Sequence, residues 1–545
     1  MTADRETPTA PVLPPRPGTD VRLVIVGAGQ INFGSPEGPW NHSTRLERKL
    51  GPRLRVVALI DPVRENAEKV LRQKRASSAM SSYRDTAVYP DIHAYLATVT
   101  PDTRPHVVWI GSPPAFRGSM REGRDIEKVL AEALPGVGVF LEKPVSTGSV
   151  DDVMEVDRYI DGKLGPVSVG YMLRYLRVSQ KLKQIISDNR LRVMAINCRY
   201  VIAYEHLTKQ WWWNKSQSLG PVIEQATHFC DLARYFGGEV ELDSIMAHSL
   251  EHFEPPSGLS KLAFDEGACI PAEERVPRVT SATWKYESGA VGSLMHVIAL
   301  HGRDFFTEID VFADGYSLRL CDAYNAPVLY VRRPGDDREE VYKYDDDDPF
   351  FSEVAGMIDA VEDPSQRHRI LTSYDDAART YAFTWAIRRA SEAYTSEAAH
   401  LAAPSCPMSS TVDVAASLPA ALRAFRLSKS SSQGAALIVK INKQQLLLEK
   451  EDEFDAISLD ELQEELPEHS PRFVLLSYAR QHEDGRTSYP LVLVYWAPAT
   501  ASMELSTLYT SALPTISAHA DIGKVIDVRD GTLSIDVLEE RLGRR

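Results

Sequence analysis

Cysteines are few in this sequence and long apolar runs are missing, and each absence argues against a class of protein. The five cysteines are scattered without a CxxC spacing, which argues against a disulfide framework and favours reduced thiols. No apolar run approaches the length of a membrane-spanning helix. Acidic residues exceed basic ones by 15, so we expect no nucleic-acid partner and no membrane partner. The sequence therefore predicts a cytoplasmic protein.

What is present indicates several compact units. A chain of 545 residues with 43% apolar and 25% charged residues is too long for one ordinary domain, and three units are expected. Residues 1–20 are rich in proline and have no apolar core of a signal peptide, so they are predicted to be a disordered leader.

The most informative stretch is Val139 to Thr147. Its apolar start predicts a buried parallel strand, and Glu142 and Lys143 follow where that strand ends. Ligands of open α/β sheets bind at such strand ends. Pro144 restricts the backbone of Lys143 to an extended conformation, which directs the amine. The alternative is a surface Glu–Lys pair before a turn.

Other predicted strands also end in residues suited to a dinucleotide. The strand at 22–26 leads into a glycine-rich turn, with Asn32 where a strict GxGxxG motif has its third glycine and Gly34 two places later. The next helix is expected to begin near Asn41 or Ser43, and a plain tight turn remains the alternative. The predicted cofactor contacts of this turn are Gly27, Gly29, Gln30 and Ile31.

The strand at 55–60 ends in Asp61, which would bind the adenosine ribose of NAD, whereas Arg64 would favour the 2′-phosphate of NADP. The strand at 106–110 ends in a turn that contributes Ser112 and Pro113. Alternating strands and helices with ligand-type residues at the strand ends predict a Rossmann domain over residues 21–147, with NAD or NADP as cofactor. Glu142 and Lys143 complete its predicted cofactor contacts.

Residues 148–397 have a different periodicity. Predicted strands at 193–200, 279–286, 292–297 and 305–311 indicate an open, largely antiparallel sheet in an α+β domain, and 350–396 is expected to be helical. A predicted helix from residue 222 carries Glu224, His228 and Asp231 close together on its surface. Zinc is a further possibility for this trio, but no HExxH motif or cysteine supports it, so no metal is predicted. Three tryptophans at 211–213 suit either sugar stacking or packing.

Taken together, four motifs resemble the Gfo/Idh/MocA oxidoreductases: 26–29, 58–61, 111–114 and Glu142-Lys143-Pro144. The resemblance covers residues 21–395 and implies hydride transfer between nicotinamide and a secondary alcohol of a sugar or polyol. It implies that Lys143 and His228 handle the hydroxyl proton, and that Glu224 orients His228 or binds substrate. Relatives commonly have aspartate at the position of Glu224.

The same resemblance implies substrate contacts for Arg174 and Asp231, and homo-oligomer contacts through the open sheet. An alternative interpretation retains the Rossmann fold but not the catalytic activity, and makes the protein a dinucleotide-binding sensor.

Beyond an Ala/Pro/Ser-rich linker at 398–412, residues 413–545 have the pattern of a separate α/β domain. Segments 422–426, 465–473 and 482–491 resemble the actin-depolymerising-factor homology (cofilin-like) fold, and within it glia maturation factor. That family binds the Arp2/3 complex, promotes debranching of actin filaments and inhibits branch nucleation, which implies a place at cortical actin. It largely lacks direct actin binding. The candidate partner contacts are Arg423, Arg426, Lys429 and Tyr509.

Two features complicate this second resemblance. Pro514 falls inside the helix expected at 503–520 and is predicted to break or kink it, and that helix lacks the family's usual basic residues. The junction of two unrelated halves is either a bifunctional protein or two neighbouring reading frames merged in one gene model.

Overall fold

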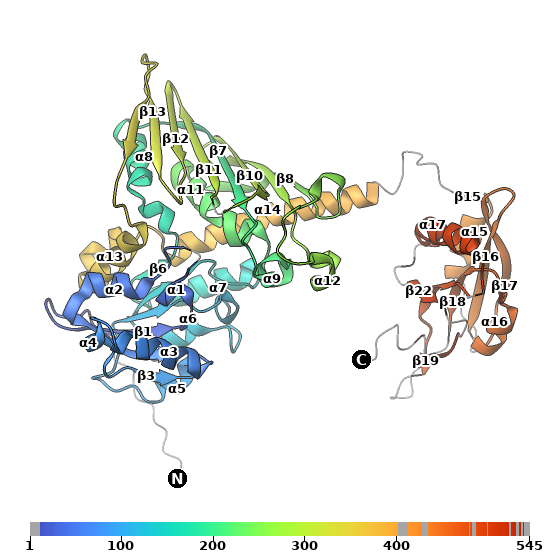
Figure 1. Ribbon diagram of the computed structural model, residues 1–545, viewed down its shortest axis with the longest axis horizontal. Coiled ribbons are helices and arrows are strands. Elements are labelled where there is room, and N and C mark those ends of the chain that lie inside the picture. Colours follow the sequence, from blue (N-terminus) through green and yellow to red (C-terminus); the bar gives the residue numbers. More distant parts are fainter. Residues whose placement is uncertain are drawn as a thin grey trace, which may run out of the picture. The chain divides into compact units, whose positions relative to one another are not determined.

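The computed structural model describes residues 11–36, 38–302, 304–401, 412–427, 434–478, 480–481, 487–498, 500–520, 522, 525–529, 533–535 and 538. The chain forms two compact units, Met1–Ser396 and Glu397–Arg545 (Figure 1). Within the described residues, no helix is both long and apolar enough to cross a membrane.

The first sheet is entirely parallel and has the strand order β3-β2-β1-β4-β5-β6. Its strands are apolar runs because helices cover both faces. They are β1 (Val21–Val26), β2 (Leu54–Ile60), β3 (Ala87–Tyr89), β4 (Val107–Ile110), β5 (Gly138–Leu141) and β6 (Val167–Val169). This is the predicted Rossmann sheet, extended by the short strands β3 and β6.

The helix expected near Asn41 or Ser43 is present among the helices around this sheet. They are α1 (Gln30–Phe33), α2 (His42–Leu50), α3 (Arg64–Arg75), α4 (Met80–Tyr83), α5 (Ile92–Leu96), α6 (Ile126–Ala133) and α7 (Val150–Ile160). The helix after the glycine turn is only four residues long, and α2 starts afresh with Asn41 as its cap, accepting a hydrogen bond from Thr44 N at 3.1 Å.

The leader expectation does not hold for residues 11–20. Val12 N–H donates to the carbonyl of Pro135 at 2.6 Å. Gly136, beside it, lies so close that an added Cβ would be 2.9 Å from the carbonyl oxygen of Val12. This part of the leader therefore packs on the Rossmann domain, and residues 1–10 lie outside the described residues.

An eight-stranded sheet of order β14-β13-β12-β11-β7-β10-β9-β8 forms the other half of the first unit (Figure 1). Only the β7–β10 pair is parallel, so the predicted open, largely antiparallel sheet is confirmed. Its strands are β7 (Val193–Ala203), β8 (Val240–Leu250), β9 (Val279–Tyr286), β10 (Val291–Leu300), β11 (Phe306–Ala313), β12 (Tyr316–Cys321), β13 (Val328–Arg332) and β14 (Glu340–Lys343).

The two faces of this sheet differ. Helices α8 (Arg177–Asp188) and α11 (Thr227–Gly237) contact strands of one face. The strands alternate in burial, and apolar side chains stand exposed on the outward positions, among them Met194, Met246 and Met295 at 62%, 67% and 44% exposure.

The helical return predicted at 350–396 is divided. It consists of α13 (Pro349–Glu362), a 3₁₀ segment η7 (Pro364–Arg369) and α14 (Tyr374–Leu401). Helix α13 packs on α2, and Tyr381 Oη of α14 donates to the carbonyl of Gly148 at 2.7 Å. Both helices thereby tie the end of this unit back to the Rossmann domain.

The C-terminal unit has a sheet of order β15-β17-β16-β18-β21-β22. Its main elements are α15 (Leu418–Leu427), β16 (Ala435–Asn442), β17 (Leu447–Phe454), α16 (Leu459–Glu465), β18 (Arg472–Ser477), β21 (Leu491–Trp496), α17 (Met503–Ala520) and β22 (Val525–Val528), with a two-residue β15 (Asp413–Val414) at one edge. Apolar residues of α15 and α17 share one core cluster with the sheet, and those of α16 share another. Ser458 and Glu461 form a capping box at the start of α16.

Strand β17 is continuous from Leu447 to Phe454. Of the break or kink predicted at Pro514, the break does not occur, because helix α17 continues from Met503 to Ala520. Burial of Tyr509, Ala512 and Ile516 against the sheet offsets the roughly 3 kcal/mol that an interior proline costs.

Candidate active site

Lys143 follows β5 at the carboxyl end of the parallel sheet. Its Nζ donates to the backbone carbonyl of Glu224 at 2.6 Å and lies 3.4 Å from Glu224 Oε1. The lysine side chain is 17% exposed, so most of it is shielded from solvent. The structure thus brings together two predicted residues that are 81 positions apart in the sequence.

Glu224 lies on a π-helical turn, η4 (Val222–Ala226), directly before α11. Such widened turns are rare and occur often at functional sites. The extra residue per turn changes the spacing on which the sequence prediction relied, because Glu224 and His228 no longer sit one regular α-turn apart. Burial raises the pKa of Glu224, and Lys143 partly offsets that effect.

His228 begins the regular part of the same helix and is buried. The edge of its ring meets Tyr171, with centroids 5.7 Å apart, and Nδ1 has no hydrogen-bond partner among the described residues. Burial first, and the positive charge of Lys143 second, hold the pKa of His228 well below its ordinary value. The imidazole is therefore neutral, and it lies close enough to Lys143 to feel the charge of the amine.

The glycine turn is shaped for close approach of a ligand. Gly27 has φ +94°, and a Cβ there would lie 2.9 Å from Ser112 N, so only glycine fits. At Gly29 no described atom lies within 4 Å of an added Cβ, which leaves its backbone open. Gln30 Oε1 accepts from Lys209 Nζ at 3.4 Å, so the sheet half brings a positive charge to this turn.

Asn32 explains the missing third glycine. It is 1% exposed, and its Nδ2 donates to the carbonyls of Val26 and Gly27 at 3.2 and 2.8 Å. The Asn32 side chain thus holds the glycine turn in place through these two hydrogen bonds. Its only signal in the sequence was its position in the imperfect motif.

Asp61 stands at the end of β2, where the ribose contact was expected. Its two oxygens accept hydrogen bonds from the backbone N–H groups of Ala28 and Val63, at 2.7 and 2.8 Å. The carboxylate is therefore fixed against the glycine turn. Arg64 instead extends into solvent, 75% exposed, and pairs with Glu68 at 2.7 Å. Open backbone at Gly29 and an oriented carboxylate fit a nicotinamide dinucleotide.

Arg117 is a site residue that sequence reasoning missed. It is fully buried, and its Nη atoms donate to the carbonyls of Ser112 and Glu142 at 2.5 Å each and to Pro144 at 3.0 Å. It ties the turn after β4, which includes Ser112 and Pro113, to the loop that carries Lys143. Nothing in the local sequence distinguishes this arginine from a surface one.

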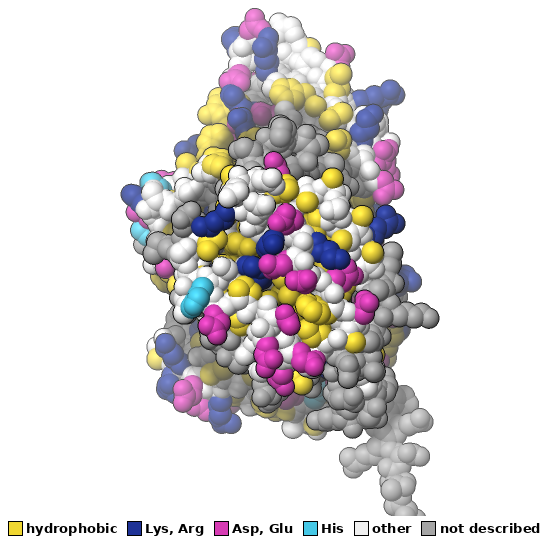
Figure 2. All heavy atoms as spheres, turned by 90° about the vertical axis from the view of Figure 1, so that its right-hand side faces the viewer, with side chains coloured by type: hydrophobic (Ala, Val, Ile, Leu, Met, Phe, Trp, Pro, Cys, Tyr) yellow, Lys and Arg dark blue, Asp and Glu magenta, His cyan; other side chains and the backbone are white. Residues whose placement is uncertain are grey.

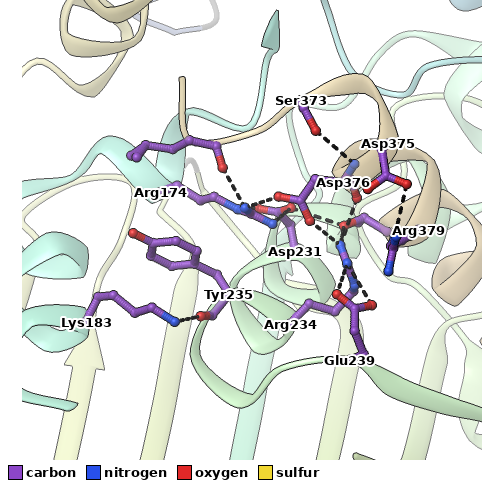
Figure 3. A network of polar contacts seen from close by, with 12 residues as sticks. Arg174, Lys183, Asp231, Arg234, Tyr235, Glu239, Ser373, Asp375, Asp376 and Arg379 are labelled. Carbon is purple, nitrogen blue, oxygen red and sulfur yellow. Dashed lines mark hydrogen bonds and ion pairs between the residues drawn. The ribbon is translucent and has the colours of Figure 1, made fainter. Parts of the chain in front are cut away.

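Arg174 and Asp231, predicted to contact substrate, are instead bound to each other. Arg174 Nε and Nη2 donate to the two oxygens of Asp231 at 2.7 Å each, and both residues are nearly inaccessible. Figure 3 shows how Asp376 joins them to Arg234, which also pairs with Glu239 at 2.7 Å. The substrate assignment of Arg174 and Asp231 is therefore corrected to an internal ion-pair network.

Two of the three consecutive tryptophans are packing residues. Trp212 and Trp213 are 6% and 0% exposed and share an apolar cluster with Tyr204 and Ile298. Trp211 is 44% exposed. Only Trp211 is therefore available for a ligand. In the described part of the chain no three His, Cys, Asp or Glu side chains are grouped to hold a metal ion.

The partner contacts predicted for the C-terminal unit divide into three cases. Arg423 is exposed on α15, whereas Arg426 Nη1 donates to the carbonyl of Ala520 at 3.3 Å. The structure corrects the predicted partner contact of Tyr509. This residue is 2% exposed and its Oη accepts from Ile441 N–H at 2.8 Å, because that face of α17 packs on the sheet. Lys429 lies outside the described residues.

Figure 2 looks onto this unit and shows basic side chains near the centre of the face with acidic ones gathered below.

Comparison with known proteins agrees with these two units. The model of the oxidoreductase family with an NAD-binding Rossmann fold, Gfo/Idh/MocA, matches residues 21–171, and an oxidoreductase C-terminal domain matches 174–316. The Schizosaccharomyces pombe protein UNK4.17 is 45% identical over 375 residues, which is 68% of this chain and 92% of that protein. The S. pombe protein C12C2.04 is 41% identical over 365 residues, 67% of this chain and 95% of that protein.

Among solved structures, levoglucosan dehydrogenase with NADH and L-sorbose has a TM-score of 0.53 at 16% identity, covering 69% of this chain and 97% of that one. The WlbA dehydrogenase of Bordetella pertussis, in complex with NADH and UDP-GlcNAcA, has a TM-score of 0.50 at 16% identity, covering 68% and 97%. These likenesses concern the fold.

For the C-terminal unit, the model of cofilin/tropomyosin-type actin-binding proteins matches residues 411–542. Human glia maturation factor beta is 39% identical over 132 residues, which is 24% of this chain and 92% of that protein. In its N-terminal unit the chain therefore belongs to the Gfo/Idh/MocA oxidoreductase family with an NAD-binding Rossmann fold, and in its C-terminal unit it belongs with glia maturation factor among the cofilin-type proteins.

Proposed function

We propose that the N-terminal unit oxidises or reduces a secondary alcohol of a sugar or polyol, with Lys143 and His228 exchanging the hydroxyl proton. The observation that carries this proposal is the Lys143–Glu224 contact at 2.6 Å beside a buried, neutral imidazole. Two nitrogen-containing side chains, both largely shielded from solvent near the carboxyl end of a Rossmann strand, suit general acid–base chemistry.

Each residue has one task in this proposal. When bound, the nicotinamide supplies the hydride acceptor or donor. The carbonyl of Glu224 holds Nζ of Lys143 in place, so the amine is oriented before substrate arrives. His228 accepts or returns the proton, and the Glu224 carboxylate, near the amine, binds a second hydroxyl of the substrate.

The experiment is a panel of sugars and polyols offered to the full chain with NAD⁺, followed by nicotinamide absorbance at alkaline pH. We expect turnover with at least one cyclic sugar or polyol. Normal NADH binding without turnover on the whole panel would favour the sensor reading instead.

We predict a preference for NAD over NADP. The carboxylate of Asp61, fixed by two backbone N–H groups, would accept from a ribose hydroxyl but repel a 2′-phosphate, and Arg64 is paired with Glu68. We expect NADH to bind at least about tenfold more tightly than NADPH, measured by fluorescence titration. Asp61→Ser should reduce this ratio, whereas the same replacement at Asp188, exposed at the end of α8, should leave it unchanged.

For the C-terminal unit we propose binding to the Arp2/3 complex and debranching of actin filaments, with Arg423 as a contact. Support comes from the 39% identity to glia maturation factor beta along nearly its whole length and from the exposure of Arg423 on α15. A place at cortical actin would follow from that partner.

The prediction is that the full chain retains Arp2/3 complex on a pull-down and that Arg423→Glu weakens this binding about fivefold, the effect of losing a contact worth ~1 kcal/mol. Lys443→Glu, in the exposed turn between β16 and β17, is the matched control. Equal binding by both variants would remove Arg423 from the interface, and no retention by the unchanged chain would remove the partner.

The exposed apolar face of the eight-stranded sheet is proposed as a contact between copies of this chain. Exposed Met194, Met246 and Met295 on β7, β8 and β10 are the observation that favours it.

A further inference from the structure

His42 is an unusual residue to find buried. It is the first residue of α2, is 1% exposed, and lies among three aromatic rings, those of Trp109, Phe140 and Phe350, with centroids 5.2, 5.1 and 6.0 Å away. Burying an imidazole is unfavourable unless it gains a hydrogen bond. Its Nε2 lies 2.6 Å from Glu142 Oε1, and because a carboxylate only accepts, Nε2 carries the hydrogen.

Glu142, which directly precedes Lys143, is held on every side. Its Oε2 accepts from the backbone N–H of Lys143 at 3.2 Å, and a Cβ added to Gly170 would lie only 2.9 Å from that oxygen. Its carbonyl accepts from Arg117 at 2.5 Å. His42 is therefore the side-chain donor that fixes the direction of the Glu142 carboxylate, next to the amine and to Glu224.

A third carboxyl group, which the proposed reaction does not use, lies close enough to Glu142 to feel its charge. Glu353, on α13, is 0% exposed, and neither of its oxygens has a hydrogen-bond partner among the described residues. The charged groups that act on it are Glu142, Asp231 and Arg45, and burial with the two negative charges raises its pKa well above the ordinary range. A carboxyl group that is fully buried and has no partner for either oxygen is favoured in its neutral form, so Glu353 adds no second negative charge near Glu142.

We propose that His42 and Glu353 form a positioning layer beneath Glu142 that keeps its carboxylate turned away from the Lys143 amine. The two residues come from helices α2 and α13, which pack on each other. The charged and titratable groups around the amine are then Glu224, His228, Arg117 and a restrained Glu142. Without the His42 hydrogen bond, the Glu142 carboxylate is free to turn toward the ammonium group and to stabilise its charge.

The test measures how readily Lys143 itself loses its proton. The full chain is exposed to dilute acetic anhydride over a range of pH, and acetylation of Lys143 is read by peptide mass spectrometry, since only the neutral amine reacts. In His42→Leu we expect the labelling midpoint to move up by about one pH unit, because an opposite charge then approaches the amine. His42→Gln keeps an N–H donor and should restore the original midpoint.

A second variant tests the neutral acid. Glu353→Gln preserves shape and charge if Glu353 is uncharged, so its midpoint should equal that of the unchanged chain; a lower midpoint means that Glu353 carries a charge and overturns the layer. An unshifted midpoint in His42→Leu overturns it too. If His42→Leu fails to bind NADH, the folded His42→Gln variant decides, since a shifted midpoint there contradicts the donor role.

The purpose of the layer rests on the proposed proton-transfer role of Lys143. The test of the layer does not depend on that role. Labelling needs no substrate, so a midpoint shift without any sugar turnover would support the layer and reject the catalytic role. Unshifted midpoints with active enzyme would reject the layer alone.

Discussion

Replacing Lys143 with methionine is expected to lower kcat by about a thousandfold, the usual contribution of a positioned acid–base group. Methionine keeps the length of the side chain but has no proton to give or take. The dissociation constant of NADH should stay unchanged, because Nζ contacts Glu224 and not the glycine turn. Steady-state rates with the best substrate of the panel, together with fluorescence titration of NADH, measure both quantities.

The matched control is Lys181→Met. Lys181 is a partly exposed lysine on α8 with no proposed role in the site, and its Nζ donates to Gln184 at 3.3 Å. It should behave as the unchanged chain. A Lys143→Met variant that keeps its turnover would remove the amine from the reaction. One that loses NADH binding as well would show that Lys143 holds the cofactor, and the loss of rate would no longer identify an acid or base.

Sequence patterns predicted the Rossmann half well because its signal is local. Each of four strands combines an apolar run with a glycine or an acid directly after it, and all four lie in one parallel sheet; the residues that follow the strands are Gly27, Asp61, Gly111 and Glu142. Strands β3 and β6 were missed because each has three residues, too few to show a period.

The supporting residues of the site could not be predicted, because their roles depend on chain segments far apart. Arg117, His42 and Glu353 act on the loop at 142–144 from a turn and two separate helices, and none has a motif. Spacing also misled: Asp231 follows His228 by three residues yet turns inward to Arg174. In the same way Tyr509, on a helix expected to face a partner, packs inside the C-terminal unit.

The comparisons bear on how the two halves are joined. Each unit matches another protein along more than nine-tenths of that protein's length, 92% and 95% for the two S. pombe relatives and 92% for glia maturation factor beta. Each is thus the size of a complete protein elsewhere. A single band near 60.7 kDa on a blot would establish one bifunctional polypeptide, and two smaller bands would establish separate products.

The second large effect concerns stability. Asp231→Ala should lower the free energy of unfolding of the N-terminal unit by about 3–5 kcal/mol, because it leaves Arg174 buried with part of its charge uncompensated. Asp376 remains as a second acceptor but is shared with Arg234 (Figure 3). Urea unfolding followed by tryptophan fluorescence reports on this unit, since every tryptophan except Trp496 lies in it.

A double replacement separates the ion pair from its surroundings. Arg174→Met with Asp231→Leu removes both charges and fills the space with apolar atoms, so it should regain most of the stability lost in Asp231→Ala. If Asp231 instead served substrate, as the sequence suggested, Asp231→Ala would unfold like the unchanged chain and raise KM. The internal pairing predicts the reverse: a large loss of stability, and in the double variant a KM close to the original, because no oxygen of Asp231 is free to reach a ligand.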